Sequence, residues 1–145
     1  MAVVESFTLD PETMDIKMFQ GDTKAFKFTA HRKSGTDWTE YDRMLFTVTD
    51  PNGEIVMQRI YRLDDQWGLG NGVVLIEFHN DDTDSWDPGT YNTEVRFDFP
   101  PIWQGTPSTA RCVNALTSSA KMIEGGNVKT KIQATLEIKA VQGRI

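Results

Sequence analysis

The chain has 145 residues and a mass of 16.4 kDa, and its 15 basic and 21 acidic side chains give a formal net charge of −6. At this length one domain, residues 1–145, buries enough apolar surface to fold without metal or disulfide crosslinks. No apolar run approaches the about 20 residues of a membrane helix, which excludes a transmembrane chain. The acidic balance also argues against nucleic acid as a partner, because duplex affinity comes mostly from clustered Lys and Arg.

Neither the N-terminus nor the single cysteine indicates a compartment. Residues 1–7 lack the basic start and the apolar stretch of about 7–15 residues that mark a secretory signal, so export by that route is not expected. Cys112 has no partner for an intrachain disulfide, and the sequence suggests no base beside it. We therefore expect an inert, buried or half-buried thiol.

A hydrophobic period of two residues dominates the chain and predicts strands with one face against a core. In chain order it predicts strands at 24–31, 43–50, 54–61, 73–79, 90–99 and 128–140, and a short strand is also expected at 16–19, before a turn at Gln20-Gly21-Asp22. The alternation is clearest in 90–99 and imperfect in 54–61, where both faces could be covered. The last strand would span about 43 Å, so we expect a bulge, a bend or a passage between sheets there.

Turn residues separate these segments. Pro51-Asn52-Gly53 predicts a hairpin, three glycines mark 64–72 as a loop, and a polar run at 80–84 is followed by a turn at Asp87-Pro88-Gly89. About seven or eight short strands with such turns predict an all-β protein, an antiparallel β-sandwich of immunoglobulin-like or related topology. An open barrel is the main alternative.

Two regions lack the two-residue period. Residues 1–13 are predicted to be an N-terminal arm. Residues 100–126 open with Pro100-Pro101, which we do not expect to continue an internal strand, and are predicted to be a long loop or insertion. Because about 27 residues exceed the usual length of an unstructured loop, we expect some order inside, either a short helix within 113–123 or a pair of strands.

The acidic stretch from Asn80 is the nearest approach to a metal motif. Asn80, Asp82 and Asp84 fit the first, third and fifth positions of a calcium loop, but Ser85 stands where glycine is needed and Tyr91 where the bidentate Glu is needed. We therefore expect no metal site, but a solvated turn in which Asp side chains accept from nearby backbone N–H groups.

Other residue types give no catalytic pattern. The glycines of 68–72 are misplaced for a dinucleotide fingerprint and precede a strand rather than a helix. His31 and His79 are predicted on outward faces, without metal-ligand spacing. A pair of hydrolytic carboxylates would leave no local signature, and nothing in the sequence favours one. We expect no catalytic residue and no cofactor.

All four tryptophans fall in predicted connections. Trp86 and Trp67 are expected to contribute to the core, with Trp86 plugging one end of the sandwich. Trp103 is the better candidate for an interface, because it follows Phe99 and Ile102 in an apolar excursion.

Several short motifs, in order, suggest a family. Residues 14–23 and 26–28 resemble the start of small β-sandwich domains in tail and baseplate proteins of phages and prophages of Gram-positive bacteria. Residues 44–48, 84–91 and 128–138 continue this likeness. Such domains look like the N-terminal part of baseplate upper proteins.

The family pattern differs in two places. Trp86 stands where the pattern usually has a smaller aliphatic residue, and residues 100–126 are longer than a simple hairpin. The resemblance implies a non-enzymatic virion component, assembled in the bacterial cytoplasm, that binds other tail or baseplate proteins or copies of itself and needs no cofactor. The alternative function is a carbohydrate-binding module that displays Trp38, Trp67 or Trp103.

Overall fold

The computed structural model describes residues 7–10, 15–32, 37–39, 42–64, 70–106, 110–116 and 121–141, and only the backbone of 7–10, 31–32, 98–104 and 121–132. In chain order its elements are β1 (Phe7–Asp10), β2 (Ile16–Phe19), β3 (Lys24–Arg32), β4 (Arg43–Thr49), β5 (Ile55–Arg62), β6 (Val73–Phe78), α1 (Asn80–Thr83), β7 (Gly89–Gln104), β8 (Cys112–Asn114) and β9 (Lys121–Lys139). Each strand predicted from the period of two is present, and the all-β class is confirmed.

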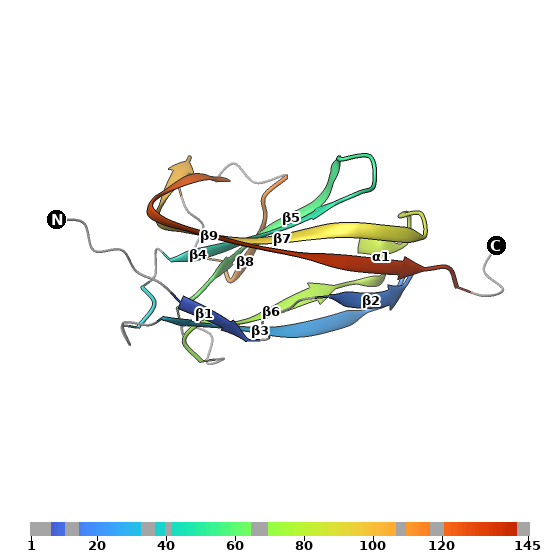
Figure 1. The fold of residues 1–145 in the computed structure, drawn as a ribbon, viewed down its shortest axis with the longest axis horizontal. Coiled ribbons are helices and arrows are strands. Elements are labelled where there is room, and N and C mark those ends of the chain that lie inside the picture. Colours follow the sequence, from blue (N-terminus) through green and yellow to red (C-terminus); the bar gives the residue numbers. More distant parts are fainter. Residues whose placement is uncertain are drawn as a thin grey trace.

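The strands form two sheets that lie face to face (Figure 1). One has three strands in the order β1-β3-β6, and the other has six in the order β2-β9-β7-β4-β5-β8. Neighbouring strands are antiparallel except β2 and β9, which run parallel. The expected sandwich is therefore confirmed, with one sheet twice as wide as the other.

The strand order resembles that of the variable-type immunoglobulin sandwich. The first two strands divide between the sheets, since β1 pairs with β3 and β2 pairs with β9. At the start of β7 the Tyr91 hydroxyl donates to the Asp87 carbonyl at 2.8 Å, the arrangement known as a tyrosine corner. One strand departs from this order, because β8 lies outside β5 although the chain reaches it from β7.

Alternate side chains of both sheets fill the space between them. Phe28 and Phe78 of the narrow sheet and Phe46 and Phe97 of the wide sheet are at most 1% exposed. Phe28 stacks on Phe97 with ring centroids 6.1 Å apart, and Phe46 meets Phe78 edge to face at 6.2 Å. Because burying a large apolar side chain contributes about 1.5–3 kcal/mol, these contacts make a major contribution to the packing of the two sheets.

Two tryptophans from loops pack into the core. Trp86 is buried and stacks on Tyr91 at 5.2 Å, as expected of a core residue. Trp38 is also buried and stacks on Phe97 at 6.4 Å, so it is not displayed for a sugar. Trp67, expected in the core, lies outside the described residues.

The prediction that Pro100-Pro101 ends a strand and that 100–126 form a long loop was wrong. Residues 100–104 belong to β7 and 121–126 to β9, and β8 lies between them, so the alternative of strands rather than a helix is correct. β4 pairs with β7 only as far as Phe97, which leaves the far part of β7 with β9 as its one described neighbour. Proline is tolerated on such an edge and at a bulge.

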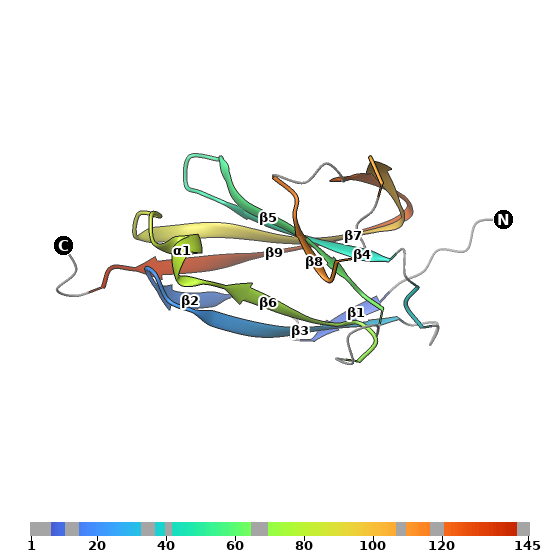
Figure 2. The ribbon, with the colours of Figure 1, turned by 180° about the vertical axis from the view of Figure 1, so that it is seen from behind.

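Irregular pairing bends this long hairpin. The register of β7 against β9 shifts between Phe99 and Pro101 and again between Ile102 and Trp103, which provides the expected bulge. The far ends of both strands curl away from the three-stranded sheet (Figures 1 and 2). At the other end of the chain, residues 7–10 of the expected arm form β1, and the rest of the arm lies outside the described residues.

Gly53 and Gly72 have nearly equal φ angles but different surroundings, so substitutions at the two positions separate backbone strain from a steric clash. Gly53 has φ +86° and open space around it, whereas Gly72 has φ +87° and a Cβ there would lie 2.2 Å from the Ala30 carbonyl oxygen. We predict that Gly53→Ala lowers the free energy of unfolding by about 1–2 kcal/mol, the cost of left-handed backbone. Gly72→Ala adds the clash and should cost about 4 kcal/mol or more in urea denaturation. Equal losses in the two variants would contradict this placement of Gly72.

Candidate functional site

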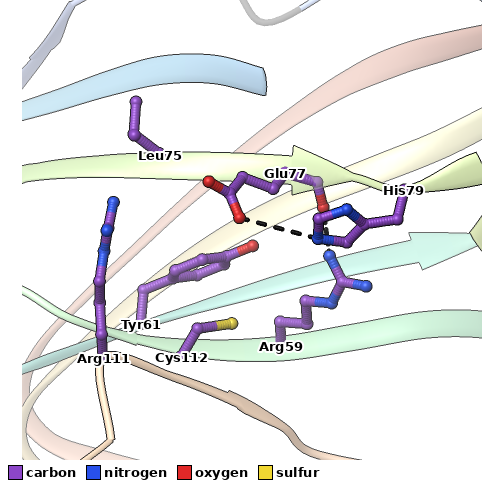
Figure 3. A pocket seen from close by; sticks show the side chains of 7 residues that line it. All are labelled: Arg59, Tyr61, Leu75, Glu77, His79, Arg111 and Cys112. Carbon is purple, nitrogen blue, oxygen red and sulfur yellow. Dashed lines mark hydrogen bonds and ion pairs between the residues drawn. The ribbon is translucent and has the colours of Figure 1, made fainter. Parts of the chain in front are cut away.

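A cavity of about 220 Å³ opens beside the edge of the narrow sheet (Figure 3). In the wide sheet β5 and β8 lie beyond β4, where the narrow sheet has no further strand after β6. These two strands form an overhang, and the cavity lies between this overhang and β6. Its lining comes from these three strands and the residues next to them: Arg59, Tyr61, Leu75, Glu77, His79, Arg111 and Cys112.

Strand register places polar side chains on the inward face of the overhang. Arg59 and Tyr61 of β5 lie opposite the core residues Phe46 and Met44 of β4, and residues opposite each other share a face. Cys112 of β8 lies opposite Tyr61 and so shares that face too. Because the narrow sheet ends at β6, these side chains meet its edge rather than another layer of apolar residues.

Arg59 joins the two sheets. Its guanidinium donates to the Glu77 carbonyl at the edge of β6 and to the Asp82 carboxylate of α1, the latter at 2.8 Å. Burial by itself would lower the pKa of Arg59, but the hydrogen bond to Asp82 and the interactions with Tyr61 and with the charge of Asp82 outweigh it and raise the pKa. This guanidinium is therefore a charged, structurally engaged group.

Two other polar groups of the cavity lack partners. Tyr61 is 2% exposed, and its hydroxyl interacts with Arg59 and with the thiol of Cys112, but neither group meets it at full hydrogen-bond geometry. Burial raises the pKa of Tyr61, so the hydroxyl keeps its proton. Nη2 of Arg111 is buried and unpartnered as well. In Figure 3 the Tyr61 hydroxyl points toward Glu77 and His79, and Arg111 extends toward Leu75.

Cys112 corrects one expectation, because the residue is exposed rather than buried or half-buried. Its sulfur nevertheless lies beside Tyr61 (Figure 3), and burial of the thiol raises the pKa of Cys112, against smaller lowering effects of Tyr61 and Arg59. The exposed His79 pairs with Glu77 at 3.7 Å. The described geometry therefore does not show a thiolate activated by a base.

The acidic run at 80–84 folds as the helical turn α1 rather than as a metal loop. Oδ2 of Asp82 accepts from the His79 backbone N–H at 2.7 Å, as expected for Asp in a turn, while Oδ1 holds Arg59. In the described part of the chain, no three His, Cys, Asp or Glu side chains are grouped to hold a metal ion. No helix of that part is long and apolar enough to cross a membrane.

The residues predicted at an interface belong to another part of the molecule. Phe99, Ile102 and Trp103 lie in the far half of β7, and their side chains are outside the described structure, as is that of His31. Sequence reasoning did not identify the cavity. The available signal was the spacing of two residues between Met57, Arg59 and Tyr61. In a strand this spacing puts all three side chains on one face, so an arginine lies in an inward row.

A second hollow, of about 360 Å³, crosses β4, β7 and β9 and is lined by Thr49, Asn92, Thr93, Glu94, Gln133 and Ala134. Asn92 and Gln133 are exposed, and none of these six residues carries a buried polar side-chain atom without a partner. This surface therefore gives less indication of a missing ligand than the cavity beside β6.

Comparison with known proteins adds no assignment: the chain matches no family model and no curated protein.

Removing the Arg59 bridge should weaken the sandwich. Arg59→Met leaves the Glu77 carbonyl and the Asp82 carboxylate without their cationic donor, and we expect the free energy of unfolding to fall by about 1–3 kcal/mol. Lys27→Met, at an exposed cation of β3, is the matched control and should change it by less than about 0.5 kcal/mol. Urea denaturation of both variants makes the comparison, and equal effects would show that Arg59 contributes no special contact.

Because the pKa of Cys112 is raised, a smaller fraction of this thiol ionises at neutral pH than of a free thiol with pKa about 8.5. We predict that iodoacetamide alkylates the folded chain several-fold more slowly at pH 7.5 than the urea-unfolded chain. The difference should shrink as pH rises and the folded thiol ionises too. Equal rates at pH 7.5 would contradict a raised pKa.

Proposed function

We propose that this chain is a non-enzymatic assembly module of a phage or prophage tail or baseplate, which binds other virion proteins or copies of itself. The observation that carries the proposal is the unequal width of the two sheets. It leaves β6 as an edge strand beside a cavity in which two buried donors, the Tyr61 hydroxyl and Nη2 of Arg111, have no acceptor at hydrogen-bond geometry. Exposed edges are the surfaces at which sheets accept strands from other chains. The phage setting is supported by the sequence resemblance.

The chemistry of the cavity favours binding over turnover. Arg59 is engaged with Glu77 and Asp82, and the raised pKa of Cys112 leaves a neutral thiol. A nucleophilic mechanism needs a side chain activated by a neighbouring base or by a lowered pKa. The described lining residues offer donors and an apolar wall instead.

Carbohydrate binding through displayed tryptophans receives no support from a described residue. Trp38 is buried in the core, and the side chains of Trp67 and Trp103 are outside the described structure. Glycan-array binding that is lost in Trp67→Ala or Trp103→Ala would favour this function over assembly.

The assembly role predicts an oligomer or a complex. Native mass spectrometry of the chain at micromolar concentration should show self-association, or co-expression with the proteins encoded beside it should yield a co-purifying complex. Either result follows from partner binding at the sheet edges. A strict monomer that also co-purifies with none of those proteins would overturn the proposal.

A further inference from the structure

We propose that the open edge of β6 beside the cavity binds the main chain of an extended peptide segment from a partner protein, as a fourth strand of the narrow sheet. This inference rests on the proposed assembly function and specifies the kind of partner group that the site takes.

The direction of the backbone groups follows from two hydrogen bonds. The Ala30 N–H donates to the Gly72 carbonyl at 3.0 Å, so even-numbered residues face β3, whereas Arg59 reaches the Glu77 carbonyl from the opposite side. Backbone groups of successive residues point to opposite edges of a strand. Leu75 therefore presents its N–H and C=O to the same open edge as Glu77, and β6 pairs with no described strand there.

Four of the described strands lie at the ends of the two sheets, and β6 is the longest of these four. β1 and β2 have four residues each and β8 has three, and such short strands offer little template for pairing. β6 has six residues, and Arg59 occupies the carbonyl of Glu77 near its C-terminal end. Pairing with a partner is thus limited to a short stretch around Leu75, next to the cavity.

The cavity supplies what a peptide group at this position needs. The Tyr61 hydroxyl and Nη2 of Arg111 are buried donors without acceptors, and they come from the overhanging β5 and β8 side. A buried polar group without a partner costs about 1–3 kcal/mol, and a carbonyl oxygen of the incoming chain would remove that cost. The Glu77 carboxylate can accept from an N–H, and Leu75 offers an apolar contact.

Charge balance favours a neutral group over an ion. The two guanidinium charges of Arg59 and Arg111 are matched by the carboxylates of Asp82 and Glu77, and His79 lies beside Glu77. A free anion would meet Glu77, and a free cation would meet both arginines. Only a group with both a donor and an acceptor, such as a peptide group, uses both kinds of side chain. At about 30 Å³ per water, the cavity has room for about seven waters that such a segment would displace.

The test is a titration of the ¹⁵N-labelled chain with the capped peptide acetyl-Thr-Val-Thr-Val-Thr-amide, followed by NMR. We expect amide shifts concentrated in residues 73–79, 59–62 and 111–113, and a slowing of Leu75 amide exchange by at least threefold at saturation. A peptide N-methylated at every residue has no N–H on either edge, cannot pair as a strand and should leave these signals in place. Sodium acetate at equal concentration tests binding of a bare carboxylate.

Variants separate a binding role from a structural one. Tyr61→Phe and Arg111→Gln should each weaken peptide binding about 3–10-fold, whereas Lys17→Gln, at an exposed cation of β2, should not change it. Because the Tyr61 hydroxyl has no partner in the free chain, Tyr61→Phe should not lower stability in urea. A loss of stability would show that the hydroxyl serves the fold instead.

The absence of shifts, equal shifts with the N-methylated peptide or acetate, or unchanged binding in both variants would each overturn the proposal. A chain that co-purifies with tail proteins but gives no shift would refute this site and leave the assembly function standing. Peptide binding by a strict monomer without protein partners would refute the assembly function and leave the site.

Discussion

Phe46 of the wide sheet meets Phe78 of the narrow sheet edge to face, with ring centroids 6.2 Å apart, and the other features of the molecule depend on where this contact lies. Phe46 belongs to β4, and the next strand outward, β5, carries Arg59 directly opposite it. The narrow sheet ends at β6, so Arg59 faces inward where no further strand covers it. An arginine there is stable because its donors reach the Glu77 carbonyl and Asp82.

The alternation of side chains and the turn residues predicted the strands well, because both signals depend only on residues close together in the chain. Alternation in 90–99 placed Tyr91, Val95 and Phe97 on one face, and all three are buried. The turn chemistry of Pro51-Asn52-Gly53 holds as well, since the Gly53 N–H donates to the Asp50 carbonyl at 3.0 Å. Side-chain period and turn residues are read within a few positions of the chain, so they do not require the neighbouring strands to be known.

The errors share a different cause, which is that strand neighbours are not encoded locally. Pro100-Pro101 was expected to end a strand, yet β4 stops pairing with β7 at Phe97 and leaves an edge where proline fits. The cavity was missed for the same reason. Arg59 and Tyr61 appear as an imperfect alternation in the sequence, and only the pairing of β5 with β4 and β8 shows that they face inward beside Cys112.

Two neighbouring polar residues in the inward row of β5, Arg59 and Tyr61, differ in how their polar groups are satisfied. Arg59 satisfies its charge by capping a backbone carbonyl and by pairing with a carboxylate, and both contacts tighten the sandwich. Tyr61, two residues later on the same face, has no such partner and remains a buried unsatisfied donor. Fold stability alone would favour phenylalanine at this position, because the hydroxyl brings a desolvation cost without a bond. A tyrosine at this position is consistent with the proposed partner strand, because a backbone carbonyl of that strand would accept from the hydroxyl.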